Sequence, residues 1–154
     1  MTPTYHRAPL ADLDPHVLYR VLRLRVQVFV VEQDCAYEDL DGRDLEPGAE
    51  LLWAADGDEV VSTVRVLHEP AALRIGRVAT APAARSRGVA AELMRRAVDR
   101  CTQLDPAASI VLDAQAHLAA WYARFGFVVD GEPFEEDGIP HLPMRRPGGS
   151  GHGA

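Results

Sequence analysis

Residues 80–98 read TAPAARSRGVAAELMRRAV, and this stretch holds the pattern from which the fold can be predicted. The segment that overlaps its start, ALRIGRVATA (72–81), is apolar and bounded by Pro82, which predicts a short strand. After Gly88, apolar residues recur every three or four positions and predict a helix to about Leu104. A strand, a loop with two arginines and a helix therefore follow one another directly.

The loop RSRGVA (85–90) has the composition of an anion-binding site. Backbone N–H groups at a helix start are unpaired, and the helix dipole adds partial positive charge. Gly88 lets a ligand approach the backbone, Val89 and Ala90 continue the row of donors, and the two arginines supply charge-assisted hydrogen bonds. Taken alone, the same residues also fit a solvated loop before an ordinary helix. The loop is not a P-loop, because it lacks the GxxxxGK[ST] pattern.

The remaining segments complete the predicted order of elements. Apolar residues at helical spacing predict a helix from Asp14 to Gln33, with Asp14-Pro15 as its cap and first turn. Segment 51–69 predicts two strands joined at Asp56-Gly57. The other expected elements are a strand over 108–115, a short helix over 117–127 ending at Gly126, and strands over 128–134 and 141–147. This order predicts an α/β (α+β) fold, a mixed sheet flanked by helices.

Composition limits the classes of function. A chain of 154 residues with 47% hydrophobic residues can bury one core, and we expect one domain over 1–147 with a disordered tail over 148–154. The formal net charge of -7 argues against a general nucleic-acid binder. No apolar run is long enough to span a membrane, and the N-terminal residues lack the apolar core of a signal peptide. We therefore expect a cytoplasmic protein with neither a nucleic-acid nor a membrane partner.

The cysteines and histidines predict no structural metal. Cys35 and Cys101 are the only cysteines and lie far apart, which favours reduced thiols over a disulfide framework. Neither belongs to a CxxC or a Cys/His pair with zinc spacing, and His141 and His152 are isolated.

A family resemblance joins these observations. The pattern R-x-x-G-x-A at 85–90, directly after a strand, resembles the [QR]-x-x-G-x-[GA] motif of the GNAT superfamily of acyl-CoA-dependent N-acyltransferases. One strand later, that superfamily has a short helix with a tyrosine and a Gly-Phe step, as in AAWYARFGF (119–127). Three segments, 24–46, 114–127 and 131–144, are similar to its ElaA-type branch. The resemblance covers most of the chain and implies a GNAT fold with a mostly antiparallel central sheet.

The resemblance implies a site for acetyl-CoA. The residues implied for the pyrophosphate are Arg85, Arg87, Gly88, Val89 and Ala90, and those for the pantetheine arm are the backbone groups of Val78, Ala79 and Thr80. In this family the strand with these three residues splays from the next one, here 110–114, and the cofactor enters the gap. Many members contact the arm through an asparagine, but this chain has none, and Gln115 or His117 occupies that neighbourhood.

The chemistry of acyl transfer points to three kinds of group. The thioester oxygen gains negative charge during attack and needs a backbone N–H, for which we expect that of Val78 or Ala79. The leaving thiolate needs a proton donor, and Tyr122 matches the family's tyrosine. The alternative for Tyr122 is an aromatic packed in the core, a place that Trp121 and Phe125 could fill instead.

The third group is a base, because the attacking amine must be neutral. The candidates are His141, His117 and Glu32, and a chain of waters could replace them all. His141 could equally be a fixed loop residue, and Glu32 a solvated acid at the end of its helix.

The acidic segment from Asp34 to Glu50 holds seven acids against Arg43 alone. It is either a solvated loop or a negative field that draws a cationic amine towards the thioester. The acids also predict a raised pKa for the Cys35 thiol.

These features together predict an N-acetyltransferase that moves an acetyl group from acetyl-CoA to a primary amine by direct attack in a ternary complex. The acceptor could be a small molecule or a protein amino group. The alternatives are a non-catalytic GNAT-fold domain that binds or senses acyl-CoA, and a protein that binds another nucleotide or phosphate. A homodimer is a possible assembly.

Overall fold

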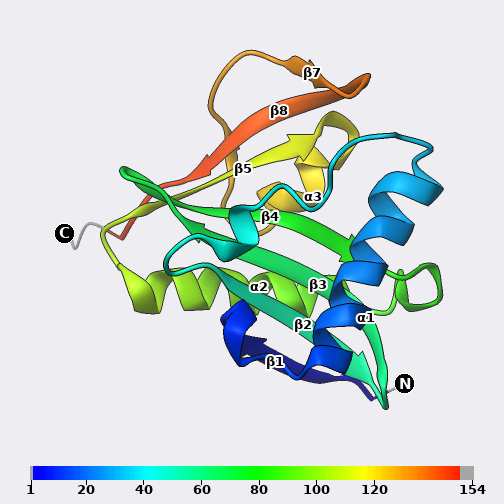
Figure 1. Ribbon diagram of the computed structural model, residues 1–154. Coiled ribbons are helices and arrows are strands. Elements are labelled where there is room, and N and C mark those ends of the chain that lie inside the picture. The colour runs from blue at the N-terminus through cyan, green and yellow to red at the C-terminus, as the bar shows by residue number, and fades with distance from the viewer. Residues whose placement is uncertain (1, 150–154) are drawn as a thin grey trace.

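One eight-stranded sheet organises residues 2–149, the part of the chain that the computed structural model describes. Its strands are β1 (Thr4–Ala8), β2 (Glu50–Asp56), β3 (Glu59–His68), β4 (Ala72–Thr80), β5 (Ser109–Gln115), β6 (Val128–Val129), β7 (Phe134–Glu136) and β8 (Ile139–Arg146). They lie in the order β1-β2-β3-β4-β5-β8-β6, and β7 pairs with β8 (Figure 1). Within residues 2–149, β4 and β5 form the sole parallel pair. The predicted mixed, mostly antiparallel sheet is confirmed.

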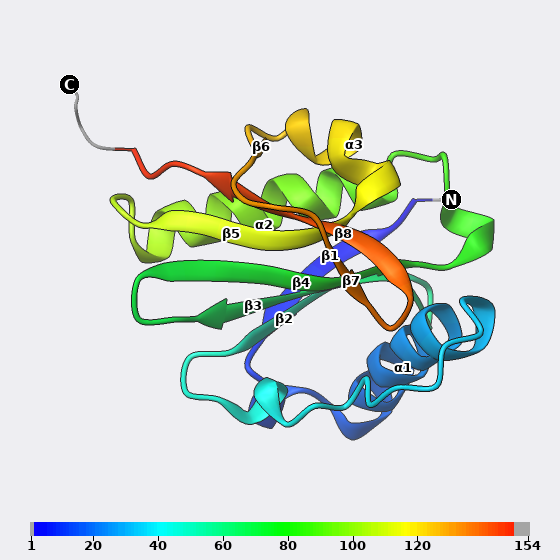
Figure 2. The same ribbon diagram turned by 90° about the horizontal axis from the view of Figure 1, so that it is seen from above.

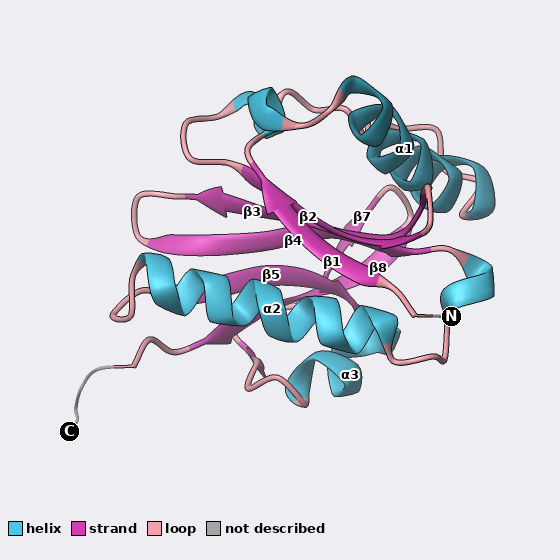
Figure 3. Cartoon of the chain, turned by 90° about the horizontal axis from the view of Figure 1, so that it is seen from below, coloured by secondary structure: helices cyan, strands magenta, loops and turns pink. Residues whose placement is uncertain are grey.

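Helices cover both faces of the sheet. Helix α1 (Pro15–Val26) lies on one face, and α2 (Val89–Leu104) and α3 (Ala119–Ala123) lie on the other (Figures 2 and 3). Helix α1 continues into η2 (Gln27–Glu32), whose hydrogen bonds are of the wider π type. Single 3₁₀ turns complete the set: η1 (Leu10–Asp12), η3 (Arg43–Leu45), η4 (Pro82–Ala84) and η5 (Ala116–Leu118).

The local chemistry that motivated three of the predicted element boundaries is present in the structure. The single strand predicted over 128–134 is wrong, because residues 130–133, which include Gly131 and Pro133, separate β6 from β7. Asp14 caps α1, since its side chain accepts the His16 N–H at 2.8 Å. The hairpin between β2 and β3 turns at Gly57, where φ is +61°. Gly126 follows α3 with φ +90°, the left-handed conformation of a helix end.

Strand β1 is absent from the sequence-based prediction. Its side chains are exposed or half-buried and therefore show no apolar alternation. The strand exists because its backbone pairs antiparallel with β2, from Thr4 opposite Ala55 to Ala8 opposite Leu51. Edge strands of this kind are specified by their neighbour more than by their own residues.

The core has two parts, one on each face. Leu93, Met94 and Ala97 of α2 are fully buried against β3 and β4. On the other face, Val21 of α1 packs against Leu51 and Trp53 of β2. The apolar periodicity of both helices is thus explained by the single sheet between them.

The remaining expectations concern the two cysteines, a membrane-spanning helix, a metal site and the C-terminal tail. Cys35 and Cys101 are both free thiols. Among residues 2–149 no helix has the length and apolarity needed to cross a membrane, and no three His, Cys, Asp or Glu side chains are grouped to hold a metal. Of the predicted disordered tail, residues 150–154 lie outside the described part, and the Gly149 N–H donates to the Pro106 carbonyl at 2.9 Å. The domain boundary at residue 147 stays a prediction.

Candidate active site

The parallel pair of strands opens into a cavity. Residues Ala72–Arg74 of β4 pair with Ser109–Val111 of β5, and no later residue of β4 pairs with β5 in the described chain. Beyond this pairing lies a cavity of about 790 Å³, lined by the C-terminal parts of both strands. The expected splay between these strands is therefore present, and it creates space at the middle of the sheet.

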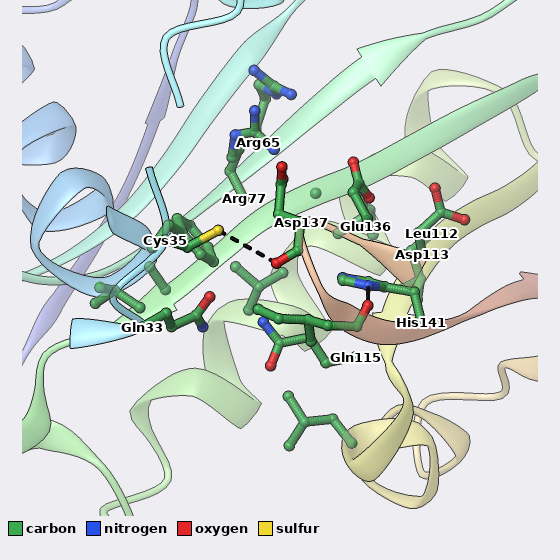
Figure 4. A pocket seen from close by; sticks show the side chains of 18 of the residues that line it. Gln33, Cys35, Arg65, Arg77, Leu112, Asp113, Gln115, Glu136, Asp137 and His141 are labelled. Carbon is green, nitrogen blue, oxygen red and sulfur yellow. Dashed lines mark hydrogen bonds between the residues drawn. The ribbon is translucent and has the colours of Figure 1, made fainter. Parts of the chain in front are cut away.

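The cavity brings together most of the predicted site residues. Those that line it are Glu32, Val78, Ala79, Thr80, Arg85, Gln115, His117, Tyr122 and His141. Four predicted phosphate-binding residues, Arg87, Gly88, Val89 and Ala90, are not among its lining residues and follow Arg85 at the start of α2. Figure 4 shows Gln33, Cys35, Gln115, Asp137 and His141 arranged around the cavity. Side chains from η2, β4, β5, α3 and the β7–β8 turn thus meet in one place.

The start of α2 has room for an anion. Gly88 is the residue before the first helical turn and has φ +78°, a conformation that favours glycine. A Cβ at this position would meet no atom within 4 Å, so the backbone faces open space. Arg87 is exposed beside it, whereas Val89 is buried and holds the helix on the sheet. This open, glycine-capped helix start fits the phosphates of a coenzyme A thioester.

Arg85 links this loop to the helix on the opposite face. Its two terminal nitrogens each lie 2.6 Å from a carboxylate oxygen of Glu32, and its Nε donates to the Thr80 carbonyl at 3.0 Å. The hydrogen bonds from Arg85 lower the pKa of the Glu32 carboxyl. The predicted phosphate ligand and one predicted base are therefore partners in this structure.

Tyr122 belongs to both the core and the cavity. It is 7% exposed, packs edge-on against Trp121 and Phe127, and lines the cavity. Burial raises the pKa of its hydroxyl to about 12. The expectation that Trp121 and Phe125 would take its core position is wrong, because both remain half-buried and pack against the cluster that contains Tyr122.

The two histidines differ in how firmly they are held. His141 on β8 is half-buried, its Nδ1 lies 2.8 Å from the Ile139 carbonyl, and its ring stacks on Phe134 at 5.6 Å between centroids. His117 lies in η5 and is exposed. Both line the cavity, so geometry alone leaves both as candidates for the base.

The acidic segment is not the solvated loop that its composition favoured. Asp39 and Asp44 are buried, and Arg25 of α1, which is fully buried, contacts their carboxylates at 3.0 and 2.7 Å. Asp41 accepts from Arg65 of β3 at 2.8 Å and from Arg77 of β4 at 3.0 Å. Arginines from three elements therefore neutralise three acids of this segment.

Sequence reasoning missed these arginines, although a signal was present. Arg25 lies four residues after Val21 and three before Val28, on the apolar face of its helix. Arg65 stands between Val64 and Val66 in a buried part of its strand. A charged residue at a buried position needs a partner of opposite charge, and the acidic segment is the nearest supply in the sequence.

Two acids at the cavity remain without an ion-pair partner in residues 2–149. Glu136, the last residue of β7, and Asp137, in the turn between β7 and β8, line the cavity and are exposed. The Asp137 carbonyl lies 3.7 Å from the Cys35 Sγ (Figure 4). Desolvation and the carboxylates of Asp137 and Asp34 raise the pKa of this thiol, as expected from its acidic surroundings.

Comparisons with known proteins show the family to which this chain belongs. A family model described as an acetyltransferase (GNAT) domain matches residues 19–147. A UPF0039 protein of Mycobacterium tuberculosis is 44% identical over 155 residues, 96% of each chain. Protein ElaA of Escherichia coli is 41% identical over 139 residues, 88% of this chain and 91% of that one. The crystal structure of an acyl-CoA N-acyltransferase from Pseudomonas aeruginosa is 39% identical with a TM-score of 0.90, covering 94% of this chain and 99% of that one.

The fold and these matches place the chain in the class of acyl-CoA-dependent N-acyltransferases. The match over residues 19–147 is more specific, and the chain belongs to the GNAT acetyltransferase family, in the branch that includes ElaA. The resemblance seen in the sequence is confirmed. Family membership supports acyl transfer from coenzyme A as the class of reaction.

Proposed function

We propose that this protein transfers an acetyl group from acetyl-CoA to a primary amine, which attacks the thioester directly while both substrates are bound. The observation that carries the proposal is the cavity between β4 and β5, with Tyr122 in its lining and the open start of α2 next to it. The cavity volume of about 790 Å³ lies in the range of small-molecule sites.

The chain offers two groups of contacts for the cosubstrate. The phosphates would be held at the start of α2, by Arg85, Arg87 and the backbone of Gly88, Val89 and Ala90. The pantetheine arm would lie along Val78–Thr80, whose amides can pair with it as with a strand, and Gln115 faces it from β5. When bound, this cosubstrate supplies the activated acyl group.

Acyl transfer requires several proton movements, and each can be assigned to a group in or near the cavity. The protonated amine loses a proton to a base, and its neutral nitrogen then bonds to the thioester carbon. This nitrogen loses a second proton to solvent as the C–S bond breaks. The N–H of Val78 or Ala79 stabilises the developing oxyanion. Tyr122 gives its proton to the leaving sulfur and regains one through solvent. A hydroxyl with a pKa of about 12 stays protonated at neutral pH, as an acid must.

Among the base candidates, Glu32 is the least suited. Its carboxylate is engaged by Arg85, and its lowered pKa makes it a weaker base. His141 and His117 have rings at the cavity, and a water held by either could take the proton.

The acceptor would be an amine that carries positive charge before it is deprotonated. The unpaired carboxylates of Glu136 and Asp137 support this choice, since they leave a negative rim where the acidic segment is neutralised. The two free thiols support a cytoplasmic location, where cysteines stay reduced.

The test is release of free coenzyme A thiol from acetyl-CoA over a panel of polyamines, amino-acid amides and peptides, with wild type and Tyr122→Phe. Thiol release with at least one amine, lost in the variant, supports the proposal. Tight acetyl-CoA binding without release for any amine would favour a sensor. Thermal stabilisation by ATP or NAD but not by acetyl-CoA would refute both.

A further inference from the structure

Arg77 has an unusual backbone conformation at the point where β4 opens. Its φ is +48°, the left-handed region that residues with a Cβ rarely adopt. Along the β3–β4 ladder, Arg65 pairs with Gly76 and Thr63 with Ala79, which leaves Arg77 and the residue after it opposite a single residue of β3. This is a β-bulge, and bulges bend a strand and redirect its backbone.

The side chain of Arg77 is held from outside the strand. Its Nε lies 2.9 Å from Asp39 Oδ1, and its Nη2 donates to Asp41 Oδ2 at 3.0 Å and to the Asp39 carbonyl at 3.2 Å. The guanidinium also lies over the Tyr37 ring, 5.4 Å from its centroid. The guanidinium therefore has partners on several sides, all of them in the acidic segment.

The partners of Arg77 are themselves fixed. Asp39 is buried, receives the Nε of fully buried Arg25 at 3.0 Å and accepts the Tyr37 hydroxyl at 3.1 Å. Asp41 forms a two-pronged pair with Arg65, at 2.8 and 3.1 Å. Figure 4 shows Arg65 and Arg77 next to each other at the edge of the cavity. The two acids that hold Arg77 are thus anchored to α1 and β3.

We infer that Arg77 is a positioning residue, locked in its left-handed conformation by Asp39 and Asp41, and that this lock sets the bulge from which Val78, Ala79 and Thr80 line the cavity. The acidic segment would then serve acyl transfer by shaping β4 rather than by attracting an amine. The inference rests on the proposed function for its effect on turnover. Arg77 itself would act through the backbone that follows it.

The test compares Arg77→Gly with Arg77→Ala. Both variants remove the guanidinium and all its ion pairs, but alanine keeps the steric penalty of positive φ and glycine does not. We expect kcat of the glycine variant to exceed that of the alanine variant about tenfold. Coenzyme A should also bind the glycine variant more tightly, because Val78–Thr80 are proposed to hold its pantetheine arm. Equal kcat values in the two variants would overturn the inference.

A second pair of variants keeps the inference testable if a variant of the first pair does not fold. If either variant fails to fold by circular dichroism, Arg77→Asn and Arg77→Leu replace them, because asparagine tolerates the left-handed region better than leucine. Higher kcat for the asparagine variant supports the lock, and equal values refute it.

The inference about Arg77 can also be tested if the proposed acyl transfer is not observed. If wild type releases no thiol with any amine, crystal structures of the alanine and glycine variants at position 77 become the measurement. A bulge kept with glycine and shifted with alanine supports the lock. An unchanged bulge with a left-handed alanine overturns it.

Discussion

Arg85 of the loop before α2 and Glu32 at the end of η2 form a two-pronged ion pair, with both nitrogen–oxygen distances 2.6 Å. The pair joins the proposed phosphate site to the segment that walls the cavity on the α1 side. Both side chains are about two-fifths exposed, so a bound phosphate could compete with the carboxylate for the same guanidinium.

The first prediction follows from this competition. Glu32→Gln removes the carboxylate that occupies Arg85 and that would repel a nearby phosphate. Because exposed ion pairs contribute up to about 1 kcal/mol, we expect acetyl-CoA to bind up to about fivefold more tightly, measured by isothermal titration calorimetry. The kcat should stay unchanged if a histidine or water is the base. Weaker binding would show that Glu32 supports the site instead of competing with it.

The double variant Arg85→Ala, Arg87→Ala should have the opposite effect. Loss of two charge-assisted contacts is expected to weaken acetyl-CoA binding by at least about tenfold, with little change in the KM of the amine. Arg95→Ala, an exposed arginine further along α2, is the matched control. An unchanged dissociation constant in the double variant would mean that the loop is merely solvated.

Tyr122→Phe separates catalysis from packing. The ring stays in the core, so the melting temperature should change little, whereas loss of the proton donor should lower kcat by about a hundredfold or more. Since burial raises the pKa of Tyr122 to about 12, wild type should show no loss of rate from this group up to about pH 10. A basic limb near pH 9 that disappears in the variant would contradict the assignment.

The lowered pKa of the Asp41 carboxyl predicts that the free energy of unfolding depends on pH. Burial alone would raise its pKa, but the hydrogen bonds from Arg65 and the Arg43 N–H lower it to about 2. A depressed carboxylate stabilises the fold above its unfolded pKa of about 4, and this contribution is lost as pH falls towards 2. We expect a loss of about 1 kcal/mol after allowance for solvent screening.

The measurement is urea unfolding as a function of pH for wild type and Asp41→Asn. The variant should lose part of the stability gained between pH 2 and pH 4, whereas Asp58→Asn, in the exposed β2–β3 turn, should not. Parallel curves for wild type and Asp41→Asn would count against the ion pair.

Arg25→Met tests the ion pairs of the two buried acids in the acidic segment, Asp39 and Asp44. Removing the guanidinium leaves Asp39 and Asp44 buried beside each other without their shared partner. Loss of one member of a buried pair costs about 3–5 kcal/mol in the free energy of unfolding. Arg23→Ala, exposed on the same helix, should cost less than about 0.5 kcal/mol. Similar values for both would mean that the acids find other partners.

Local sequence determined the helices, most of the strands and the loop before α2 that is proposed to bind phosphate. The cap Asp14, the turn at Gly57 and the helix start at Gly88 each have a conformation that nearby residues prescribe. These features depend on contacts within a few residues, so a single sequence is sufficient to predict them. Strand β1 escaped prediction because its pairing with β2 lies outside its own residues.

The tertiary structure decided which arginine and carboxylate side chains form ion pairs. The seven acids of this segment indicate a solvated surface when only the sequence is considered. The fold nevertheless brings Arg25, Arg65 and Arg77 from three other elements to Asp39, Asp41 and Asp44. It also decided that Arg85 meets Glu32, although 53 positions separate them. The sequence alone indicated a coenzyme A-dependent class, because the R-x-x-G-x-A motif at 85–90 lies within six consecutive residues. How its ionised groups pair depends on long-range packing, since an ion pair requires proximity that only the folded sheet provides.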